Sequence, residues 1–171
     1  MKNIKLYTPK EYELDFAKNL LNDPATMAYN KGYDLDFHGY DKETGTITHD
    51  HSYWGKWYEL YFTNPGEYFY AYIYDQDLKV FVGDVNFHPS KLNPHARDIG
   101  IVIKDEFRGK GYGKAGLKLL IDEAFSFDSI KTLCNNFEKE RASALKIHED
   151  LGFETIAEYD GIIEVILKNQ K

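Results

Sequence analysis

Residues 108–116, RGKGYGKAG, hold four glycines within nine positions. They follow the apolar run 99–103 and precede the periodic apolar run 117–125, so they join a predicted strand to a predicted helix. Glycine at this density is favoured only where the backbone takes up positive φ or must approach another group closely. The N–H groups of such a turn, at the positive end of a helix, form a cradle for an anion. The stretch therefore predicts a strand–turn–helix unit that binds a phosphate-bearing ligand, with a structural turn carrying solvated lysines as the alternative.

Two common phosphate-binding motifs fit this stretch poorly. Residues 111–116 match GxGxxG, but residues 105–108 intervene after the strand, where the fingerprint has its first glycine almost at once, and too little chain follows for a second mononucleotide-binding half. A Walker loop fails because its glycine and lysine are one residue too close, and Ala115 stands where a magnesium-binding Ser or Thr is needed. The remaining pattern is R-x-x-G-x-G, from residue 108 to residue 113.

The N-terminal part of the chain predicts a strand followed by helices. Residues 4–8 alternate as in a short strand, and a capping box at Thr8 and Glu11 predicts a helix over 9–21. Pro24 follows the helix expected over 9–21 and ends it, because the proline ring disfavours helical geometry in the preceding residue. The same proline begins segment 24–29. A second short helix is expected there.

The middle of the chain predicts a loop, a helix and a hairpin. Residues 30–50 hold glycines and many acids without a clear period, which is typical of a long loop. Aromatic and apolar residues recur at helical spacing over 53–61, and we expect that helix to pack on the core. Runs 67–74 and 78–88 are rich in Phe, Tyr, Val and Ile and predict an antiparallel hairpin.

The C-terminal half predicts strands alternating with helices. Strand 97–104 is expected to be buried on both faces, because it holds the run Ile-Val-Ile. The elements after it are a helix ending near residue 125, a strand at 130–134, a helix at 139–151 capped by Gly152, and hairpin strands at 153–159 and 162–167.

Composition limits the class of protein. The 171 residues predict one domain, 1–171, and a net charge of −7 without a basic run argues against nucleic acid as a partner. A single cysteine, Cys134, excludes an internal disulfide framework and a Cys-rich zinc site, and we expect no metal. The chain lacks an apolar stretch of the ~18 residues that a membrane span requires, so we expect a cytoplasmic protein without membrane contact.

With the motif RGKGYG the chain resembles the GNAT superfamily of acetyl-CoA-dependent N-acetyltransferases, whose central motif is Gln/Arg-x-x-Gly-x-Gly/Ala between a strand and a helix. A second family motif ends in Gly-Phe after a short helix, and residues 141–153, RASALKIHEDLGF, fit its spacing. The resemblance covers roughly residues 69–167 and implies an α+β fold. In that fold a central mixed, mostly antiparallel twisted sheet of six to seven strands is flanked by helices, and two neighbouring strands splay apart.

The resemblance also implies which residues bind acetyl-CoA. The backbone of Ile101, Val102 and Ile103 would pair with the pantetheine arm at the exposed strand edge. The pyrophosphate would lie on the glycine turn, formed by Arg108, Gly109, Lys110, Gly111, Tyr112, Gly113 and Lys114. Asn135, Asn136 and Ser143 would bond the pantetheine, although asparagine in a turn is equally well explained by local capping.

Acetyl transfer to an amine requires a base, an oxyanion-stabilising group and an acid. Family members often place a carboxylate on the strand before the glycine turn, and Asp98 matches it; the alternative is a strand-end carboxylate paired with Arg97. Asp84 is a second candidate base, and Asn86 and His88 share its strand face by period two. Strand N–H groups at Val102 or Ile103 are candidate oxyanion donors.

The acid is the point at which the chain departs from the family. His148 stands where the family often has the Tyr that protonates the departing thiolate, and Arg141 stands where it often has Asn. Imidazole titrates near neutral pH, so His148 is the candidate acid. The alternative is a histidine on the inner helix face that donates to a carbonyl.

The resemblance predicts an N-acetyltransferase that moves an acetyl group from acetyl-CoA to a primary amine by direct attack in a ternary complex. Acids and aromatic residues of loop 30–50 favour a small cationic acceptor such as a polyamine, an aminoglycoside-like sugar or an amino-acid amine. Acetylation of a protein or peptide N-terminus and a non-catalytic acyl-CoA-binding module are the alternatives. The exposed aromatic residues permit a homodimer.

Overall fold

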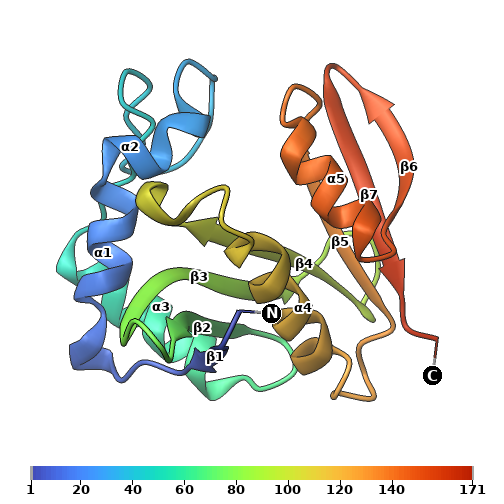
Figure 1. Cartoon of the computed structure of the whole chain (residues 1–171), viewed down its shortest axis with the longest axis horizontal. Helices are drawn as coiled ribbons and strands as arrows, with labels where there is room; N and C mark the ends of the chain where they lie inside the picture. The colour runs from blue at the N-terminus through green and yellow to red at the C-terminus, as the bar shows by residue number, and fades with distance from the viewer. Residues whose placement is uncertain (1, 171) are drawn as a thin grey trace.

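Seven strands pair into one mixed sheet in the order β1-β2-β3-β4-β5-β7-β6 (Figure 1). The computed structural model describes residues 2–170, so the first and last residues of the expected domain lie outside it. The strands are β1 (Ile4–Tyr7), β2 (Phe69–Asp75), β3 (Val80–Pro89), β4 (Ala96–Ile103), β5 (Thr132–Glu138), β6 (Glu154–Tyr159) and β7 (Ile162–Lys168). The helices are α1 (Asp15–Asn22), α2 (Pro24–Met27), α3 (His51–Thr63), α4 (Tyr112–Ala124) and α5 (Ala142–Asp150). This is the mixed, mostly antiparallel α+β arrangement that the resemblance implies.

Helices cover both faces of the sheet. On one face α4 packs on β2 and β4 so closely that a Cβ at Gly116 would lie 2.5 Å from Ile73 Cδ1. On the other face, side chains of α1 and α3 form an aromatic cluster with Tyr70 and Tyr72 of β2. The layers are therefore helix, sheet and helix, with an aliphatic core under α4 and an aromatic core under α3.

The sheet changes character between β4 and β5. These two strands are parallel and pair only over Ala96–Asp98 and Thr132–Cys134, whereas the other neighbouring strands pair antiparallel. Beyond that point β4 runs on to Ile103 and β5 to Glu138, and the two strands diverge (Figure 1). Over residues 99–103, β4 keeps its pairing with β3, but within residues 2–170 no strand pairs with its opposite edge, the one toward β5.

The divergence corrects one expectation about β4. Ile101, Val102 and Ile103 are partly exposed rather than buried on both faces. The Ile-Val-Ile run resembles a central strand, but its neighbour has turned away, which leaves this edge and part of its side chains uncovered.

Two other boundaries differ from the sequence prediction. The expected helix over 9–21 is a 3₁₀ turn, Glu11–Glu13, followed by α1, and the capping interaction runs from Lys10 N–H to the Glu13 carboxylate at 2.8 Å. The capping box at Thr8 was therefore wrong by two residues. β5 extends past residue 134 because its antiparallel pairing with β7 continues to Glu138, so Asn135 and Asn136 lie in a strand and not in a turn.

Other expected elements are confirmed. Residues 31–50 contain turns and one isolated bridge, Tyr40 to Ile47, as expected of a long loop. The β2–β3 and β6–β7 hairpins form as predicted, and Gly152 ends α5 with a φ of 89°. None of the helices in the described part of the chain combines the length and the apolar character needed to cross a membrane.

The close approach of α4 to the sheet predicts opposite effects of adding side-chain atoms to two helical glycines. Gly116→Val overpacks the contact with Ile73 and should lower the free energy of unfolding by about 1–3 kcal/mol. Gly55→Ala, in α3, adds a methyl group that meets no heavy atom of the described chain within 4 Å apart from its neighbours in sequence and the backbone of its own helix, and should raise the free energy of unfolding by about 0.5–1 kcal/mol. Urea unfolding measures both; an equal effect of the two substitutions would contradict the packing argument.

Candidate active site

The glycine turn after β4 has the backbone geometry that its sequence predicts. Gly109 and Gly111 have φ values of 70° and 86°, a region that L side chains rarely adopt. A Cβ built on either residue meets no heavy atom of the described chain within 4 Å beyond its neighbours in sequence. The backbone here is therefore both left-handed and open to an approaching group.

The same turn begins α4. Gly111 is the N-cap and has no side chain with which to cap the helix, and the first intrahelical bond runs from Ala115 N–H to Gly111 C=O at 3.2 Å. The first-turn N–H groups, at Tyr112, Gly113 and Lys114, lack carbonyl partners within the helix and lie at its positive end. These N–H groups have the placement that the predicted anion cradle requires.

The basic side chains of the turn are engaged with the protein. Arg108 donates to Ile103 C=O at 3.1 Å and also to Thr26 C=O at the end of α2. Lys110 donates to Glu106 C=O at 2.7 Å, and Lys114 to the Asp150 carboxylate at 3.0 Å. The backbone of the turn, rather than Arg108, is thus the part most available to an anion.

Tyr112 has a structural side chain. It is 2% exposed, and its hydroxyl donates to Asp75 Oδ2 at 2.6 Å. This hydrogen bond raises the pKa of Tyr112 to about 12. Of this residue only the backbone N–H can take part in the cradle.

The open edge of β4 presents alternate N–H groups. Lys104 N–H donates to Val82 C=O of β3 at 2.9 Å, and Val102, two residues earlier and paired with Asp84, points its N–H toward the same strand. Successive N–H groups of a strand point to opposite edges, so those of Ile101 and Ile103 face the edge that β5 has left. This geometry favours Ile101 and Ile103 over Val102 as donors to a ligand at that edge.

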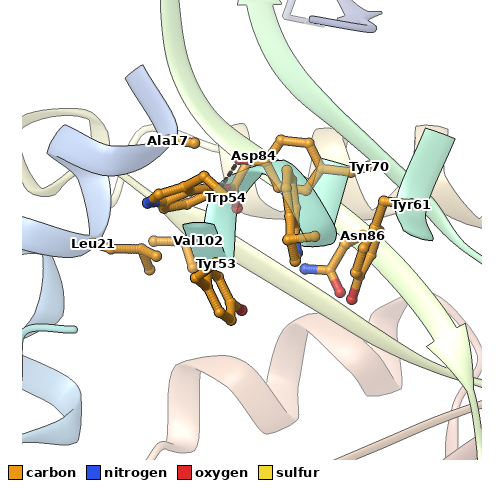
Figure 2. A pocket seen from close by; sticks show the side chains of 10 residues that line it. Ala17, Leu21, Tyr53, Trp54, Tyr61, Tyr70, Asp84, Asn86 and Val102 are labelled. Atoms are coloured by element: carbon orange, nitrogen blue, oxygen red, sulfur yellow. Dashed lines mark hydrogen bonds between the residues drawn. The ribbon is translucent and has the colours of Figure 1, made fainter. Parts of the chain in front are cut away.

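Asp84 lines a cavity of about 140 Å³. Figure 2 shows aromatic side chains gathered around it. We call this the aromatic cavity; its other lining residues are Ala17, Leu21, Tyr53, Trp54, Trp57, Tyr61, Tyr70, Asn86 and Val102. Asp84 is 5% exposed, and Tyr70 O–H donates to its Oδ2 at 2.6 Å.

Burial raises the pKa of Asp84 to about 7, because the ionised carboxylate loses its hydration. The hydrogen bonds from Tyr70 and from Val102 N–H act in the opposite direction by stabilising the charged form. A carboxyl group that titrates near neutral pH inside a cavity is a candidate proton acceptor.

Asn86 lies beside Asp84 because Gly100 leaves room for it. A Cβ at Gly100 would lie 2.6 Å from Asn86 Nδ2. The period-two prediction that Asp84 and Asn86 share a face is confirmed, since both line the aromatic cavity.

Asp98 lies away from this cavity. It is the last β4 residue to pair with β5, opposite Cys134, and it lines a hollow of about 630 Å³ together with His88 and Glu164. We call this the β4–β5 hollow; Asn135 and Asn136 also line it. The structure thus separates the two candidate carboxylates.

The alternative explanation of Asp98 as the partner of Arg97 is wrong. Arg97 is 5% exposed and donates to backbone carbonyls instead, at distances of 2.8–2.9 Å to Gly66, Pro94 and Ala96.

His148 has both ring nitrogens engaged. The ring is 3% exposed, Nδ1 is 2.8 Å from Ala144 C=O, and Nε2 is 3.0 Å from Asn135 Nδ2. Nδ1 therefore carries the proton and Nε2 accepts from the amide, and burial lowers the pKa of His148. This is the carbonyl-bonded arrangement that the sequence left as the alternative to an acid. Ser143 is exposed on α5.

Two features were missed at the sequence level. The aromatic face of α3 was expected only to pack on the core, yet it lines the cavity around Asp84. Arg141, at the start of α5, places its guanidinium 4.6 Å from the ring centroid of Tyr29, so the two sides of the β4–β5 divergence are in contact. The density of aromatic residues over 53–61 was the available signal for the first feature; the second depends on tertiary contact.

The acids of loop 30–50 are not brought to the aromatic cavity. Asp34 pairs with Lys42, and Asp41 accepts from Glu43 N–H at 2.8 Å. Neither lines the cavity, so the attraction of a cation by this loop remains a prediction. Within residues 2–170, no three His, Cys, Asp or Glu side chains gather as metal ligands.

Comparison with known proteins places these features in context. The family model described as an acetyltransferase (GNAT) domain matches residues 3–154. A search of curated protein sequences gives no significant match. The solved structures described next share only 16–17% sequence identity with this chain, so their similarity to it shows a shared fold and nothing more.

The most similar solved structures include the Vibrio cholerae spermidine N-acetyltransferase with CoA and spermine, at 16% identity and TM-score 0.73, covering 97% of this chain and 95% of that one. The yncA structure from Salmonella typhimurium with its cofactor acetyl-CoA is 17% identical, with TM-score 0.71 and coverage of 97% and 94%. A dodecameric structure of the Vibrio enzyme has 16% identity, TM-score 0.70 and the same coverages of 97% and 94%.

The raised pKa of Asp84 predicts a pH-dependent stability difference between the wild type and Asp84→Asn. The folded state holds the proton more tightly than the unfolded state, so the stability from protonated Asp84 is complete below about pH 4 and is lost as the pH rises through about 7. Asparagine mimics the protonated carboxyl group. Relative to that variant, the wild type should lose on the order of 4 kcal/mol between pH 4 and pH 8.

Urea unfolding at pH 4 and pH 8 measures this difference. Tyr70→Phe is the matched control, because it removes a hydrogen bond that lowers the pKa of Asp84 and should extend the loss to higher pH. A difference between the wild type and Asp84→Asn that stays constant with pH would disprove the titration of Asp84 in this range.

Proposed function

The chain belongs to the acetyltransferase (GNAT) family, and we propose that it transfers an acetyl group from acetyl-CoA to the primary amine of a small cationic acceptor. GNAT enzymes use acetyl-CoA as co-substrate, which supplies an activated acetyl thioester. The observation that carries the proposal is the position of Asp84. Asp84 pairs across the sheet with Val102, on the strand whose other edge is open, and its carboxyl group lies in the aromatic cavity.

The residues present fit the acetyl donor. The left-handed, open backbone at Gly109 and Gly111, with the first-turn N–H groups of α4, suits a pyrophosphate. The free edge of β4 offers the N–H groups of Ile101 and Ile103 to the pantetheine and to negative charge that develops on the acetyl oxygen. Contacts from Asn135, Asn136 and Ser143 belong to the same proposal.

Asp84 is the base that we favour. An amine enters the aromatic cavity as an ammonium ion and gives a proton to the Asp84 carboxylate, whose pKa of about 7 suits transfer near neutral pH. Desolvation by the aromatic walls lowers the pKa of the amine and so helps this transfer. The nitrogen then attacks the acetyl carbon directly, and the C–N bond forms. The C–S bond breaks with its electron pair on sulfur, and the second proton that leaves the nitrogen ends on this thiolate, giving the amide and free CoA thiol.

Asp98 and His148 have different roles in this mechanism. Asp98 remains the second candidate base, for an acceptor that enters through the β4–β5 hollow. His148 is better suited to positioning than to acid catalysis, because its Nε2 holds the Asn135 amide.

The size of the aromatic cavity supports a small acceptor over a peptide terminus, which needs an open groove. The spermidine N-acetyltransferase structures support a cationic amine as acceptor, and the dodecameric one supports self-association, for which we propose a homodimer at least. A cytoplasmic location is proposed on the sequence grounds given above.

The acetyl-CoA site is tested with a pair of substitutions at left-handed glycines. Asparagine tolerates positive φ, so Gly111→Asn keeps the turn while placing a side chain over the N–H cradle. It should weaken acetyl-CoA binding by about tenfold or more, the equivalent of one charge-assisted hydrogen bond. Gly161→Asn, at φ 77° in the β6–β7 turn, is the matched control and should leave binding unchanged. Calorimetry decides, and equal affinities of the two variants would place the donor elsewhere.

The base is tested by the pH dependence of free-thiol release. Asp84→Asn should lower kcat/KM by about 10²–10⁴-fold and abolish the inflection near pH 7, whereas Asp98→Asn should retain both activity and inflection. His148→Gln should leave the pH dependence of kcat/KM unchanged above neutral pH, because a residue that only positions another group neither gives nor takes a proton in the reaction. Loss of activity in Asp98→Asn with an unchanged Asp84→Asn would instead assign the base to Asp98.

A further inference from the structure

The walls of the aromatic cavity come mainly from one helix face. Tyr53, Trp54, Trp57 and Tyr61 stand at positions i, i+1, i+4 and i+8 of α3, and Tyr70 adds a fifth ring from β2 (Figure 2 labels all but Trp57). Asp84 and Asn86 lie among these rings. The cavity therefore combines two polar side chains with flat apolar rings.

The rings hold one another in place. Trp57 packs edge-to-face on Trp54 at 5.2 Å and on Tyr70 at 4.7 Å, and it stacks on Tyr61 at 4.8 Å. These centroid distances lie in the favourable range for aromatic pairs. A wall made of interlocked rings changes shape little on binding, so it selects a ligand whose surface already matches it.

The cavity can neutralise one positive charge. Among the ten described residues that line it, Asp84 is the only one with a formal charge. One ammonium ion can pair with Asp84 and also interact with the neighbouring ring faces. A second ammonium ion held in the cavity would be a buried charge without a partner, and a sugar rich in hydroxyl groups would lose hydration against the rings.

We propose that the acceptor is a monoamine in which a short linker joins one primary ammonium group to a flat apolar group. The ammonium pairs with Asp84 and donates a second hydrogen bond to the Asn86 amide oxygen, while the flat group packs on the α3 rings. This inference rests on the proposed acetyl transfer, since it names the acceptor for the same site. It separates monoamines from the polyamines and aminoglycoside-like sugars that the sequence left open.

Calorimetry with three probes of similar size tests the inference on the full chain without acetyl-CoA. The probes are 2-phenylethylamine, 1,4-diaminobutane, which replaces the ring by a second ammonium group, and 2-phenylethanol, which lacks the charge. We expect 2-phenylethylamine to bind about tenfold or more tightly than either of the others, because only it uses both the carboxylate and the rings.

Two variants assign the preference to the cavity. Trp57→Leu keeps apolar bulk and should weaken 2-phenylethylamine about tenfold while leaving 1,4-diaminobutane unchanged. Asp84→Asn should bind 2-phenylethylamine and 2-phenylethanol equally. Leu60→Ala, at an exposed position of α3 outside the cavity, is the control and should match the wild type. Urea unfolding confirms that each variant is folded.

The outcomes separate this inference from the proposed acetyl transfer. Tighter binding of 1,4-diaminobutane or of spermidine, no binding of 2-phenylethylamine, or no effect of Trp57→Leu overturns the monoamine. Free-thiol release from acetyl-CoA is measured separately with the same amines. Release that is fastest with spermidine overturns the monoamine and keeps acetyl transfer. Binding of 2-phenylethylamine in the expected order, without release by any amine, keeps the ligand class of the cavity and overturns acetyl transfer.

Discussion

The short parallel contact between β4 and β5 is the constraint on which the remainder of the site depends. Three residue pairs hold the two strands together, and beyond Asp98 the edge of β4 has no strand partner in the described chain. Backbone N–H and C=O groups need hydrogen-bond partners, so an open edge takes them from water or from a ligand. The glycine turn lies at the end of this same edge. The open strand and the anion cradle therefore form one continuous backbone surface.

The two faces of the sheet serve different purposes. On one face Gly116 lets α4 approach the sheet closely, which fixes the helix start and hence its first-turn N–H groups beside β4. On the other face the aromatic residues of α3 bury Asp84. Burying a carboxyl group is unfavourable, and only part of this cost is offset by Tyr70 and Val102 N–H. The pKa of the Asp84 carboxyl group therefore lies near 7. The fold tolerates the cost of burying this group, and the carboxylate is basic enough to accept a proton.

Most of the strands and helices, and the glycine cradle, could be predicted from the sequence because they depend on short segments. The positive φ of Gly109 and Gly111 follows from glycine density, and the closing hairpin follows from the Asp-Gly turn. Two boundaries were misplaced because an interaction with other residues sets them. At Lys10 the helical turn starts where the backbone N–H donates to the carboxylate three residues on. At Asn135 the strand continues because β5 stays paired with β7. The choice between Asp84 and Asp98 had the same difficulty. Both residues fit the pattern of a strand carboxylate, but only contact with α3 shows which of them is enclosed by aromatic rings.

The sequence alone determined the order of the elements, the conformation of the glycine turn that we propose binds an anion, and the family to which the chain belongs, since each is written in local periodicity and in motifs of a few residues. Only the tertiary structure decided which carboxyl group is buried, which N–H groups of β4 face the open edge, and that His148 uses both nitrogens internally. These properties arise from contacts such as that between Tyr70 and Asp84, which lie 14 residues apart. Burial and hydrogen-bond direction depend on how elements pack, and packing is not contained in any one segment.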